Sequence, residues 1–499
     1  MQYYPVIGLE IHIELKTSSK MFCTCLNDPN EKQANLNICP VCMGHPGTLP
    51  VINKEAVRKV IKTGLAINCR VLEFSKFDRK SYFYPDLPKG YQISQYDKPL
   101  CVEGFLDVQE KPETKTTRRI RVRRVHLEED TGRLIHPENA DYSLVDFNRA
   151  GIPLMELVTE PDIKSAFNAR RFAEEFQLIL RYMDISDADM EKGQMRVEVN
   201  ISLSAKPLAD GADIDLEKLG TKVEIKNLNS FRSVERGINY EIERQAKALD
   251  AGEKITQETR GWDENQGITV SQREKEEAHD YRYFPEPDLP PLHFDEQEIK
   301  EIRTEILELG QERRQRLISE YQIDDKAAEI FVQNKELGEY FEKVVSELDP
   351  RADKQVLYNL IKITANYLTS DVLGLLGKNA FSLSGFNVTA ENFADFISLI
   401  GEGRVLSAVA KQVLKKMIET GADPNHIIKE EGLSQVTDEN EIKQAVAEVV
   451  SKNTKAVDDY QKGNKNALQF LIGQIMAETK GRADPAVVSR IIDDLLHGK

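Results

Sequence analysis

The feature of this sequence that most constrains its fold is a set of segments in which apolar and charged residues alternate. Residues 6–15 place isoleucine or leucine at every second position from Ile7, with Glu10, His12 and Glu14 between them. Successive side chains of a β-strand point to opposite faces, so this spacing predicts a strand with one buried and one polar face. Three further segments repeat the pattern: residues 119–129, 195–202 and 222–226. We therefore predict an antiparallel sheet whose back packs on a core and whose front carries Glu, His, Asn, Arg and Lys.

One of these segments ends in adjacent acids. The alternation of residues 119–129 slips by one position before Arg124, which a β-bulge would explain. Beyond the slip, Arg124, His126 and Glu128 share one face, and the run closes with Glu129 and a third acid. Crowded carboxylates attract a cation, and repeated Glu and His on strand faces suit a metal that prefers oxygen ligands. Ordinary solvent-facing strands show the same pattern, so this alternative stays open.

The overall composition limits the class of protein. A chain of 499 residues is long enough for about three domains. Its formal net charge is −16, so any contact with nucleic acid must come from local basic patches. No run approaches the length of an apolar membrane span, and residues 3–15 alternate instead of forming a signal peptide. We expect a cytoplasmic protein with no membrane contact.

All six cysteines lie in the first 101 residues, and four of them form two short pairs. The pairs are Cys23 with Cys25 and Cys39 with Cys42. Their separation is typical of a zinc ribbon, in which four thiolates form a closed, structural site. The tight spacing of the first pair leaves buried free thiols as the alternative. Cys69 and Cys101 have no partner in the sequence and are expected to pack in a core.

Residues 77–97 are rich in Tyr, Pro, Lys and Asp and predict an ordered loop instead of a helix. Arg79, Lys80 and Lys89 in this stretch are candidates for binding phosphate or carboxylate groups. The aromatic residues have a second interpretation, in which they only pack the loop against the domain.

Beyond a proline-rich stretch that ends near residue 291, the pattern becomes helical. Asp295 with Glu298 predicts a capped helix start, and helices are expected over residues 327–345 and 354–376. We predict an α+β fold in three parts: residues 1–293 with the antiparallel sheet, flanking helices and zinc-ribbon insert; 294–409, all helical; and 410–499, a small helical tail. The tail holds a basic cluster of Lys462, Lys465, Lys480 and Arg482, which is either a nucleic-acid contact or a solvated face.

The common motifs for phosphate binding and acyl transfer are absent. The sequence has no G-x-x-x-x-G-K-[ST] loop, no G-x-S-x-G elbow, no kinase motif set and no obvious triad for glutamine hydrolysis. A chain that used ATP would therefore bind it without these loops.

Several longer motifs resemble the GatB family, the B subunits of glutamyl- and aspartyl-tRNA amidotransferases. They are Val6–His12, Asp78–Gln95, His126–Gly132, Lys226–Phe231 and Asp280–Asp288, with Gly463–Leu468 and Gly473–Met476 in the tail. The resemblance runs nearly end to end and implies a cradle-like catalytic domain followed by helical and YqeY-like tRNA-binding domains.

The resemblance also implies a reaction. Family members use ATP and Mg²⁺ to phosphorylate the side-chain carboxylate of Glu-tRNA(Gln) or Asp-tRNA(Asn), and ammonia then displaces the phosphate to leave an amide. The ammonia comes from an amidase-type glutaminase A subunit through a channel, and a small C subunit holds the heterotrimer together. The activity is that of a carbon–nitrogen ligase of the glutamine-hydrolysing glutaminyl-tRNA synthase type.

The resemblance also implies roles for several residues in these motifs. Magnesium is implied at Glu10, His12, Glu128 and Glu129, with Glu198 nearby in a position where relatives often have Asp. His12 is an unusual ligand for so hard an ion, which suggests a mixed site or an indirect role. Lys80 and Lys89 match positions along the ammonia path and count with these residues as catalytic candidates, while Arg79 and Lys80 are candidates for ATP. The four cysteines match the zinc-bearing branch of the family.

Two other functions remain open at this level. A non-enzymatic RNA-binding scaffold would explain the missing phosphate loop but not the Glu and His on the strand faces. An ATP-dependent ligase acting on a free amino acid would leave the tail without a purpose. ATP turnover that depends on charged tRNA would separate these hypotheses.

Overall fold

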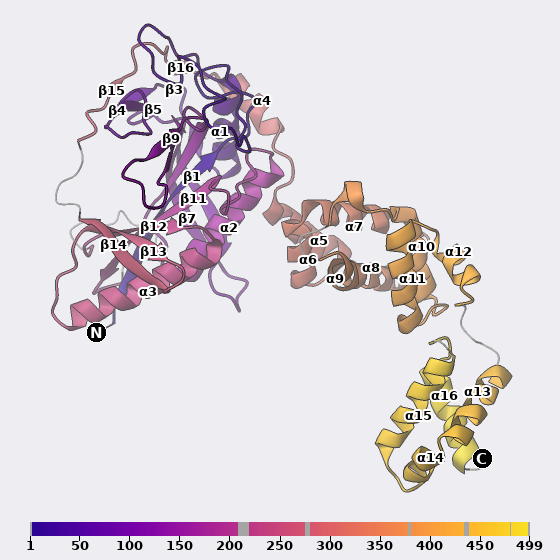
Figure 1. Cartoon of the computed structure of the whole chain (residues 1–499). Coiled ribbons are helices and arrows are strands. Elements are labelled where there is room, and N and C mark those ends of the chain that lie inside the picture. The colour runs from indigo at the N-terminus through magenta and orange to yellow at the C-terminus, as the bar shows by residue number, and fades with distance from the viewer. Residues whose placement is uncertain are drawn as a thin grey trace. The chain divides into compact units, whose positions relative to one another are not determined.

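The computed structural model describes residues 2–207, 219–274, 280–377, 381–433, 439–479 and 481–497. The chain divides into two compact units, residues 1–309 and residues 310–499 (Figure 1). The first is mixed α/β and the second is helical, as the α+β prediction expects. None of the helices in the described ranges is both long and apolar enough to cross a bilayer.

The first unit is built on a large sheet, to which nine strands of the described residues belong. Their order is β14-β13-β12-β11-β1-β10-β7-β6-β2, and neighbours are antiparallel except β12 and β13, which are parallel. The bounds are β1 (Tyr4–Glu14), β2 (Arg70–Val71), β6 (Cys101–Gln109), β7 (Thr117–Glu129), β10 (Pro153–Thr159), β11 (Met195–Ser204), β12 (Val223–Leu228), β13 (Glu258–Asp263) and β14 (Ile268–Glu274). The four predicted strands thus lie in one sheet, as β1, β7, β11 and β12.

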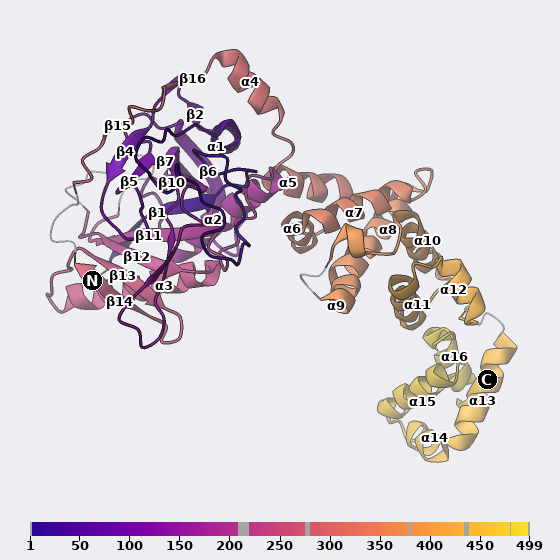
Figure 2. The same cartoon turned by 45° about the horizontal axis from the view of Figure 1, so that its top comes forward.

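One face of this sheet forms the core of the unit. Ile7, Ile11 and Ile13 of β1 are fully buried in it, together with apolar residues of three helices. These helices are α1 (Lys54–Ala66), α2 (Ala166–Tyr182) and α3 (Phe231–Asp250). In Figures 1 and 2, α2 and α3 run side by side along the sheet. The opposite face is left to the polar side chains, which confirms the predicted division of the strand residues.

The predicted β-bulge is present in β7. Val158 of β10 pairs with Arg124, whereas the next residue, Thr159, pairs with Val122. Arg123 therefore has no opposing residue in β10. The extra residue keeps the apolar positions on both sides of the bulge turned toward the core.

The prediction of an ordered loop at residues 77–97 is wrong at both ends, where the structure has short strands. Residues 78–81 (β4) and 91–94 (β5) pair as an antiparallel hairpin, and Phe284–Pro285 (β15) pairs on the other side of β4. There are also two small two-stranded sheets among the described residues. In one, β3 (Phe74–Ser75) pairs with β16 (Leu292–His293), and in the other, β8 (Arg133–Ile135) pairs with β9 (Leu144–Asp146). The hairpin is extended on the β4 side by β15, which lies far away in the sequence.

Helix α4 (Glu296–Thr304) ends the first unit. The side chain of its N-cap, Asp295, accepts a hydrogen bond from the Glu298 N–H at 2.8 Å, which confirms the predicted start. Ile302 is buried in the core of the first unit, so α4 belongs to that unit, which ends at residue 309. The predicted boundary follows residue 293 and would instead place α4 in the helical part.

In the second unit, every regular element of the described residues is a helix. A single helix was expected over residues 327–345, but Asn334 ends α6 and accepts a cap hydrogen bond from Leu337 N at the start of α7. The predicted boundary after residue 409 falls inside α11, and the three-domain division stays a prediction. The helices are α5 (Gly310–Tyr321), α6 (Asp325–Gln333), α7 (Lys335–Glu347), α8 (Lys354–Asn366), a π-helix (Tyr367–Val372), α9 (Leu373–Leu376), a 3₁₀ turn (Leu383–Gly385), α10 (Ala390–Gly401), α11 (Ser407–Thr420), α12 (Pro424–Glu430), α13 (Glu439–Lys452), α14 (Thr454–Gln461), α15 (Lys465–Glu478) and α16 (Pro485–His497).

The tail helices α13, α15 and α16 share a core of their own, which includes Val446, Leu471 and Ile492. The predicted basic cluster of the tail includes Lys480 and the side chain of Lys465, and both lie outside the described residues.

Candidate active site

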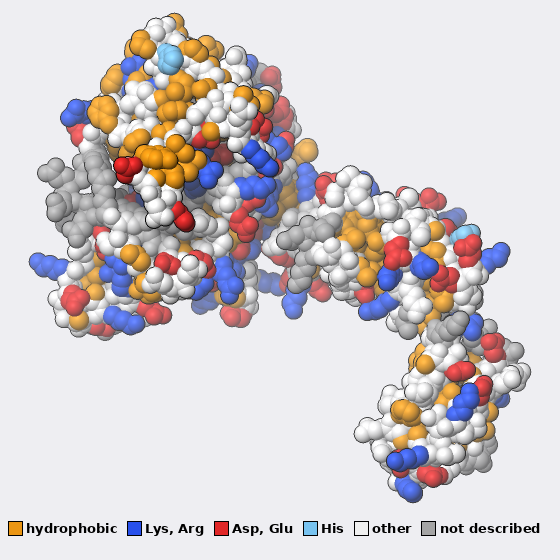
Figure 3. Space-filling model, in the orientation of Figure 1, with side chains coloured by type: hydrophobic (Ala, Val, Ile, Leu, Met, Phe, Trp, Pro, Cys, Tyr) orange, Lys and Arg blue, Asp and Glu red, His pale blue; other side chains and the backbone are white. Residues whose placement is uncertain are grey.

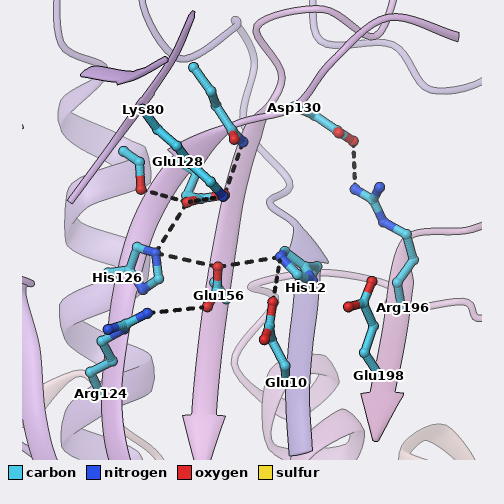
Figure 4. Close-up of polar contacts among 12 residues, drawn as sticks. Glu10, His12, Lys80, Arg124, His126, Glu128, Asp130, Glu156, Arg196 and Glu198 are labelled. Atoms are coloured by element: carbon cyan, nitrogen blue, oxygen red, sulfur yellow. Dashed lines mark hydrogen bonds and ion pairs between the residues drawn. The ribbon is translucent and has the colours of Figure 1, made fainter. Parts of the chain in front are cut away.

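A chain of imidazole and carboxylate groups crosses three adjacent strands on the polar face of the sheet. His12 of β1, Glu156 of β10 and His126 of β7 are paired in register. Their side chains meet at one oxygen, because Oε2 of Glu156 lies 3.4 Å from Nε2 of His12 and 3.5 Å from Nε2 of His126. Figure 4 shows Glu156 between the two rings. The strand order thus joins three residues that are far apart in sequence.

Further carboxylates flank this row. Oε1 of Glu10 lies 3.8 Å from Nε2 of His12, and Oε1 of Glu128 lies 3.3 Å from Nε2 of His126. Glu198 is paired in register with Glu10 on the neighbouring strand, but it forms an ion pair with Lys226 at 2.9 Å. Of the predicted residues, Glu10, His12 and Glu128 therefore lie in one cluster, and Glu198 stands at its edge.

Glu128 is the most enclosed of these acids and is only 2% exposed. It accepts hydrogen bonds from Ser94 Oγ and from Gln92 Nε2, both on β5. Lys80 Nζ on β4 lies 3.9 Å from its Oε1 and 5.2 Å from the ring centroid of Tyr281. The hairpin of β4 and β5 therefore brings a cation and two donors over the sheet at Glu128.

The pKa values of the cluster follow from burial and mutual charge. Burial and the charge of Glu156 raise the pKa of Glu10 to about 7. Burial opposes the protonation of His12, yet its hydrogen bond to Glu156 and the surrounding carboxylates raise its pKa to about 9. Burial likewise opposes ionisation of Glu156, but the charge of His126 and the bond from His12 lower its pKa to about 2. Despite its burial, Glu128 has a pKa well below the usual range, mainly because of Lys80.

The cluster fits a divalent cation. Two sets of side chains each offer ligand atoms within 4.8 Å of one another: Glu10, His12 and Glu156, and His126, Glu128 and Glu156. Carboxylate oxygens are the ligands that Mg²⁺ prefers, and ion binding at His12 would release its proton.

Glu129, although adjacent to Glu128, lies elsewhere. Neighbouring residues of a strand point to opposite sides, so its carboxylate turns away from the cluster. Both its oxygens lie 2.5 Å from Lys89 Nζ, and one accepts a hydrogen bond from Ile93 N at 3.0 Å. This pair lines a cavity of about 90 Å³ whose wall includes Cys42 and Gly44. The structure thus separates Lys89 and Glu129 from the residues predicted to bind magnesium and places them beside the cysteine site.

Arg79 and Asp130 are both held in ion pairs. Arg79 donates two hydrogen bonds to Glu286, at 2.6 and 2.8 Å, and its guanidinium stands 4.3 Å from the ring centroid of Tyr91. The acid after Glu129, Asp130, lies 2.7 Å from Arg196. Arg79 is therefore engaged by protein groups in this structure, whereas Lys80 faces the cluster.

The four cysteines of the predicted zinc ribbon lie together. Their Sγ atoms are within 4.8 Å of one another, close to the separation of about 3.8 Å that a tetrahedral site with Zn–S bonds of about 2.3 Å requires. A hydrogen bond from Cys23 is the main cause that lowers the pKa of Cys42 to about 5. Cys69 and Cys101 are buried free thiols in the core, as predicted.

Glu156 and His126 were missed as candidate site residues. Glu156 is a single acid within the apolar run Pro153–Thr159, where a buried charge without a role is rare. His126 shares its face with Glu128, as the alternation predicted. The acid within the apolar run is the signal that could have identified Glu156.

Comparison with known proteins identifies relatives over the whole chain. Residues 5–300 match the model of the GatB/GatE catalytic domain, and residues 339–496 match the GatB domain. Proteins named as the B subunit of aspartyl/glutamyl-tRNA(Asn/Gln) amidotransferase are similar along their full length. That of Persephonella marina is 46% identical, with 99% of this chain and 100% of the relative covered. Those of Thermotoga maritima and Caldicellulosiruptor bescii are 45% and 44% identical, with 100% and 99% of each chain covered.

Proposed function

This chain belongs to the GatB family, and we propose from that premise that it is the B subunit of a tRNA-dependent amidotransferase. Its substrates are Glu-tRNA(Gln), Asp-tRNA(Asn) or both, whose side-chain carboxylates it converts to amides in an ATP-dependent reaction. The observation that supports this most is the row of His12, Glu156 and His126 with Glu10 and Glu128 beside it. A buried concentration of acids of this kind suits an ion that binds phosphates.

The reaction needs an activated carboxylate, because oxide is too poor a leaving group for direct attack by ammonia. An oxygen of the substrate carboxylate attacks the γ-phosphorus of ATP, and the bond to the β-phosphate oxygen breaks to release ADP. Ammonia then adds to the carbonyl carbon, phosphate leaves, and a base accepts the proton lost from nitrogen. Magnesium, when bound, supplies charge neutralisation at the phosphates.

The residues of the cluster divide into ligands and supports. Glu156 would hold a metal ion together with Glu10 and His12 on one side and with His126 and Glu128 on the other, while the ion pair with Lys226 assigns Glu198 a supporting place. His126 and Arg124 fix the carboxylate of Glu156 from β7, with Arg124 3.7 Å from its Oε1. Lys80 places a cation beside Glu128, where it can contact phosphate oxygens. Arg79 would reach a nucleotide only after leaving Glu286.

Lys89 and Glu129 have a different role, on the route of ammonia to the activated carboxylate. They lie beside a cavity and point away from the carboxylate cluster. The ammonia comes from a glutaminase A subunit, and a C subunit completes the heterotrimer. Hydrophobic side chains gather on the face of the first unit that Figure 3 shows. Phe83, Tyr84 and Leu144 of this unit are half exposed or more. Exposed apolar patches of this kind suit docking of a partner protein.

The cysteine site would stabilise the structure, and the helical region and the tail would bind the tRNA. The four thiolates of the cysteine cluster bind zinc, which leaves no free position for substrate and makes the site structural. The helical region and the tail contact tRNA through its shape and backbone. A tRNA substrate and a thiolate site both suit a reducing cytoplasm.

The test compares Glu128→Gln with Glu129→Gln in the reconstituted complex, using either glutamine or ammonium chloride as the nitrogen source. Glu128→Gln should lose amide formation with both sources, together with tRNA-dependent ATP cleavage. Glu129→Gln should lose mainly the reaction with glutamine, because free ammonia bypasses the delivery route. Both variants should still bind tRNA.

Other outcomes contradict the assignment. Full activity of Glu128→Gln would mean that the cluster is structural, and the chain would then be an RNA-binding scaffold for chemistry on a partner. Equal losses of Glu129→Gln with both nitrogen sources would place Glu129 in the phosphorylation step instead of ammonia delivery.

A further inference from the structure

Lys20 is a fully buried lysine next to the four-cysteine site. Its side chain is among the largest that are completely enclosed, with a residue exposure of 0%. Nζ donates hydrogen bonds to the carbonyl oxygens of Ala150, at 2.7 Å, and Phe147, at 3.3 Å, and lies 3.9 Å from Sγ of Cys42. Across the described ranges, no carboxylate forms an ion pair with Lys20.

A buried ammonium group without an opposite charge is strongly unfavourable, and two neutral carbonyl groups compensate it only in part. The nearest anion available is the thiolate of Cys42. Four thiolates around a divalent cation leave two excess negative charges, and Cys42, unlike the other three cysteines, is buried. Each group therefore supplies the charge that the other lacks.

We propose that Lys20 is the internal counter-charge of the four-thiolate metal site and fastens that site to the turn at residues 147–151. The proposal rests on the metal site proposed above. It makes Lys20 a positioning residue, since it acts on the metal through Cys42 and not by direct ligation. Removing such an outer contact typically lowers metal affinity by about 10- to 100-fold.

The turn connects the cysteine site to the polar side of the sheet. Met21 N donates to Gly151 O at 2.7 Å, and Gly151 N donates to Asp130 O at 2.9 Å. Gly151 has a φ of +84°, and a Cβ at this position would stand 3.4 Å from Cys42 Cβ and 3.9 Å from Glu129 Oε2. Strand β10, which carries Glu156, begins two residues later. Lys20 thus holds the metal site against the segment that leads into the catalytic strand.

The test measures zinc release from the full chain to an excess of a chromogenic chelator. Lys20→Met keeps the aliphatic stem and removes the charge, and we expect it to release zinc about 10- to 100-fold faster than the wild type. Lys16→Met is the matched control, because Lys16 is exposed and pairs with Asp184 and Asp187. Its release rate should not change.

The outcomes separate the two proposals. A wild-type chain that binds no zinc overturns the metal site and, with it, the role of Lys20. A wild-type chain that holds zinc while folded Lys20→Met releases it at the same rate overturns only the role of Lys20.

A further comparison applies if the single variant Lys20→Met does not fold. In Cys42→Ser, the ammonium group of Lys20 would be buried without its counter-charge. If Lys20 has the proposed role, the double variant Lys20→Met/Cys42→Ser, which has no unpaired ammonium group, should unfold at a higher urea concentration than Cys42→Ser. A double variant that is also unfolded, or less stable than Cys42→Ser, overturns the proposal. It would show that Lys20 is needed for its carbonyl contacts whether or not the thiolate is present.

Discussion

Oε2 of Glu156 lies 3.4 Å from Nε2 of His12 and 3.5 Å from Nε2 of His126, so one carboxylate oxygen on β10 joins imidazoles of both neighbouring strands. Glu156 is consequently shared by the two sets of candidate metal ligands. A residue in this position affects every other member of the cluster, and it gives the first prediction.

Glu156→Gln keeps the size of the side chain and removes its charge. We expect amide formation from ammonium chloride to fall by about 100-fold or more, as is usual when a preorganised electrostatic contact is removed. Binding of tRNA should be unchanged, because Glu156 is buried. Glu160→Gln is the matched control, since Glu160 lies just beyond β10 and pairs with Arg123 outside the cluster. Normal activity of the Glu156 variant would exclude the shared role.

Gly44 tests whether the cysteine site positions Lys89. Its φ is +67°, and a Cβ there would stand 2.5 Å from Lys89 Cγ and 3.1 Å from Lys89 Cα. Gly44→Ala should therefore displace Lys89 from Glu129 and lower glutamine-dependent activity more than activity with ammonium chloride.

Gly47→Ala is the control for backbone strain. Gly47 has a φ of +84° but nothing within 4 Å of a Cβ. Both variants should lose about 1–2 kcal/mol of stability from the left-handed backbone conformation. Only Gly44→Ala should change the ratio of the two activities, and an equal change in Gly47→Ala would contradict the contact with Lys89. The single tryptophan, Trp262, is buried in β13 and reports unfolding of the first unit.

The ion pairs of Glu342 lead us to expect that the stability of the helical unit depends on pH. It accepts hydrogen bonds from Arg313, at 2.6 Å, and Arg316, at 2.5 Å. Burial opposes its ionisation, but these contacts lower its pKa below the ordinary 4.5. A depressed folded pKa contributes stability that is present above the unfolded value and is lost as pH falls through the folded value. Helices α5 to α7 should therefore lose stability below about pH 4.5.

Hydrogen exchange of peptides from residues 310–347, corrected for the intrinsic rate, measures this effect. Glu342→Gln should show weaker protection at neutral pH and a smaller further loss in acid. Glu347→Gln, at an exposed position of the same helix, should behave as the wild type. An unchanged acid response in Glu342→Gln would assign the effect to other carboxylates.

The sequence predicted which side chains share the polar face, because alternation is a local property of each strand. Glu10, His12, His126 and Glu128 lie where the period-two pattern places them. The same rule puts Glu129 on the other side of its strand, so adjacency in sequence did not make it a neighbour of Glu128 in space. Local patterns were therefore reliable for the direction of side chains.

Periodicity could not predict which strands pair. β10 lies between β1 and β7, which are separated by more than a hundred residues, and alternation carries no information on such partners. For this reason the central place of Glu156 was not predicted. The hairpin of β4 and β5 was missed for the same reason, because such short strands form only with neighbouring strands to support them.

The measurement that tests the central claim most directly follows the oxygen atoms of the substrate. Glutamyl-tRNA(Gln) labelled with ¹⁸O in its side-chain carboxylate is converted to the amide by the reconstituted complex with ATP and ammonium chloride. If the carboxylate is phosphorylated, one labelled oxygen appears in inorganic phosphate for each amide formed, and Glu156→Gln produces almost no labelled phosphate. Amide formed together with unlabelled phosphate would show that the carboxylate is not the phosphoryl acceptor and would contradict the account.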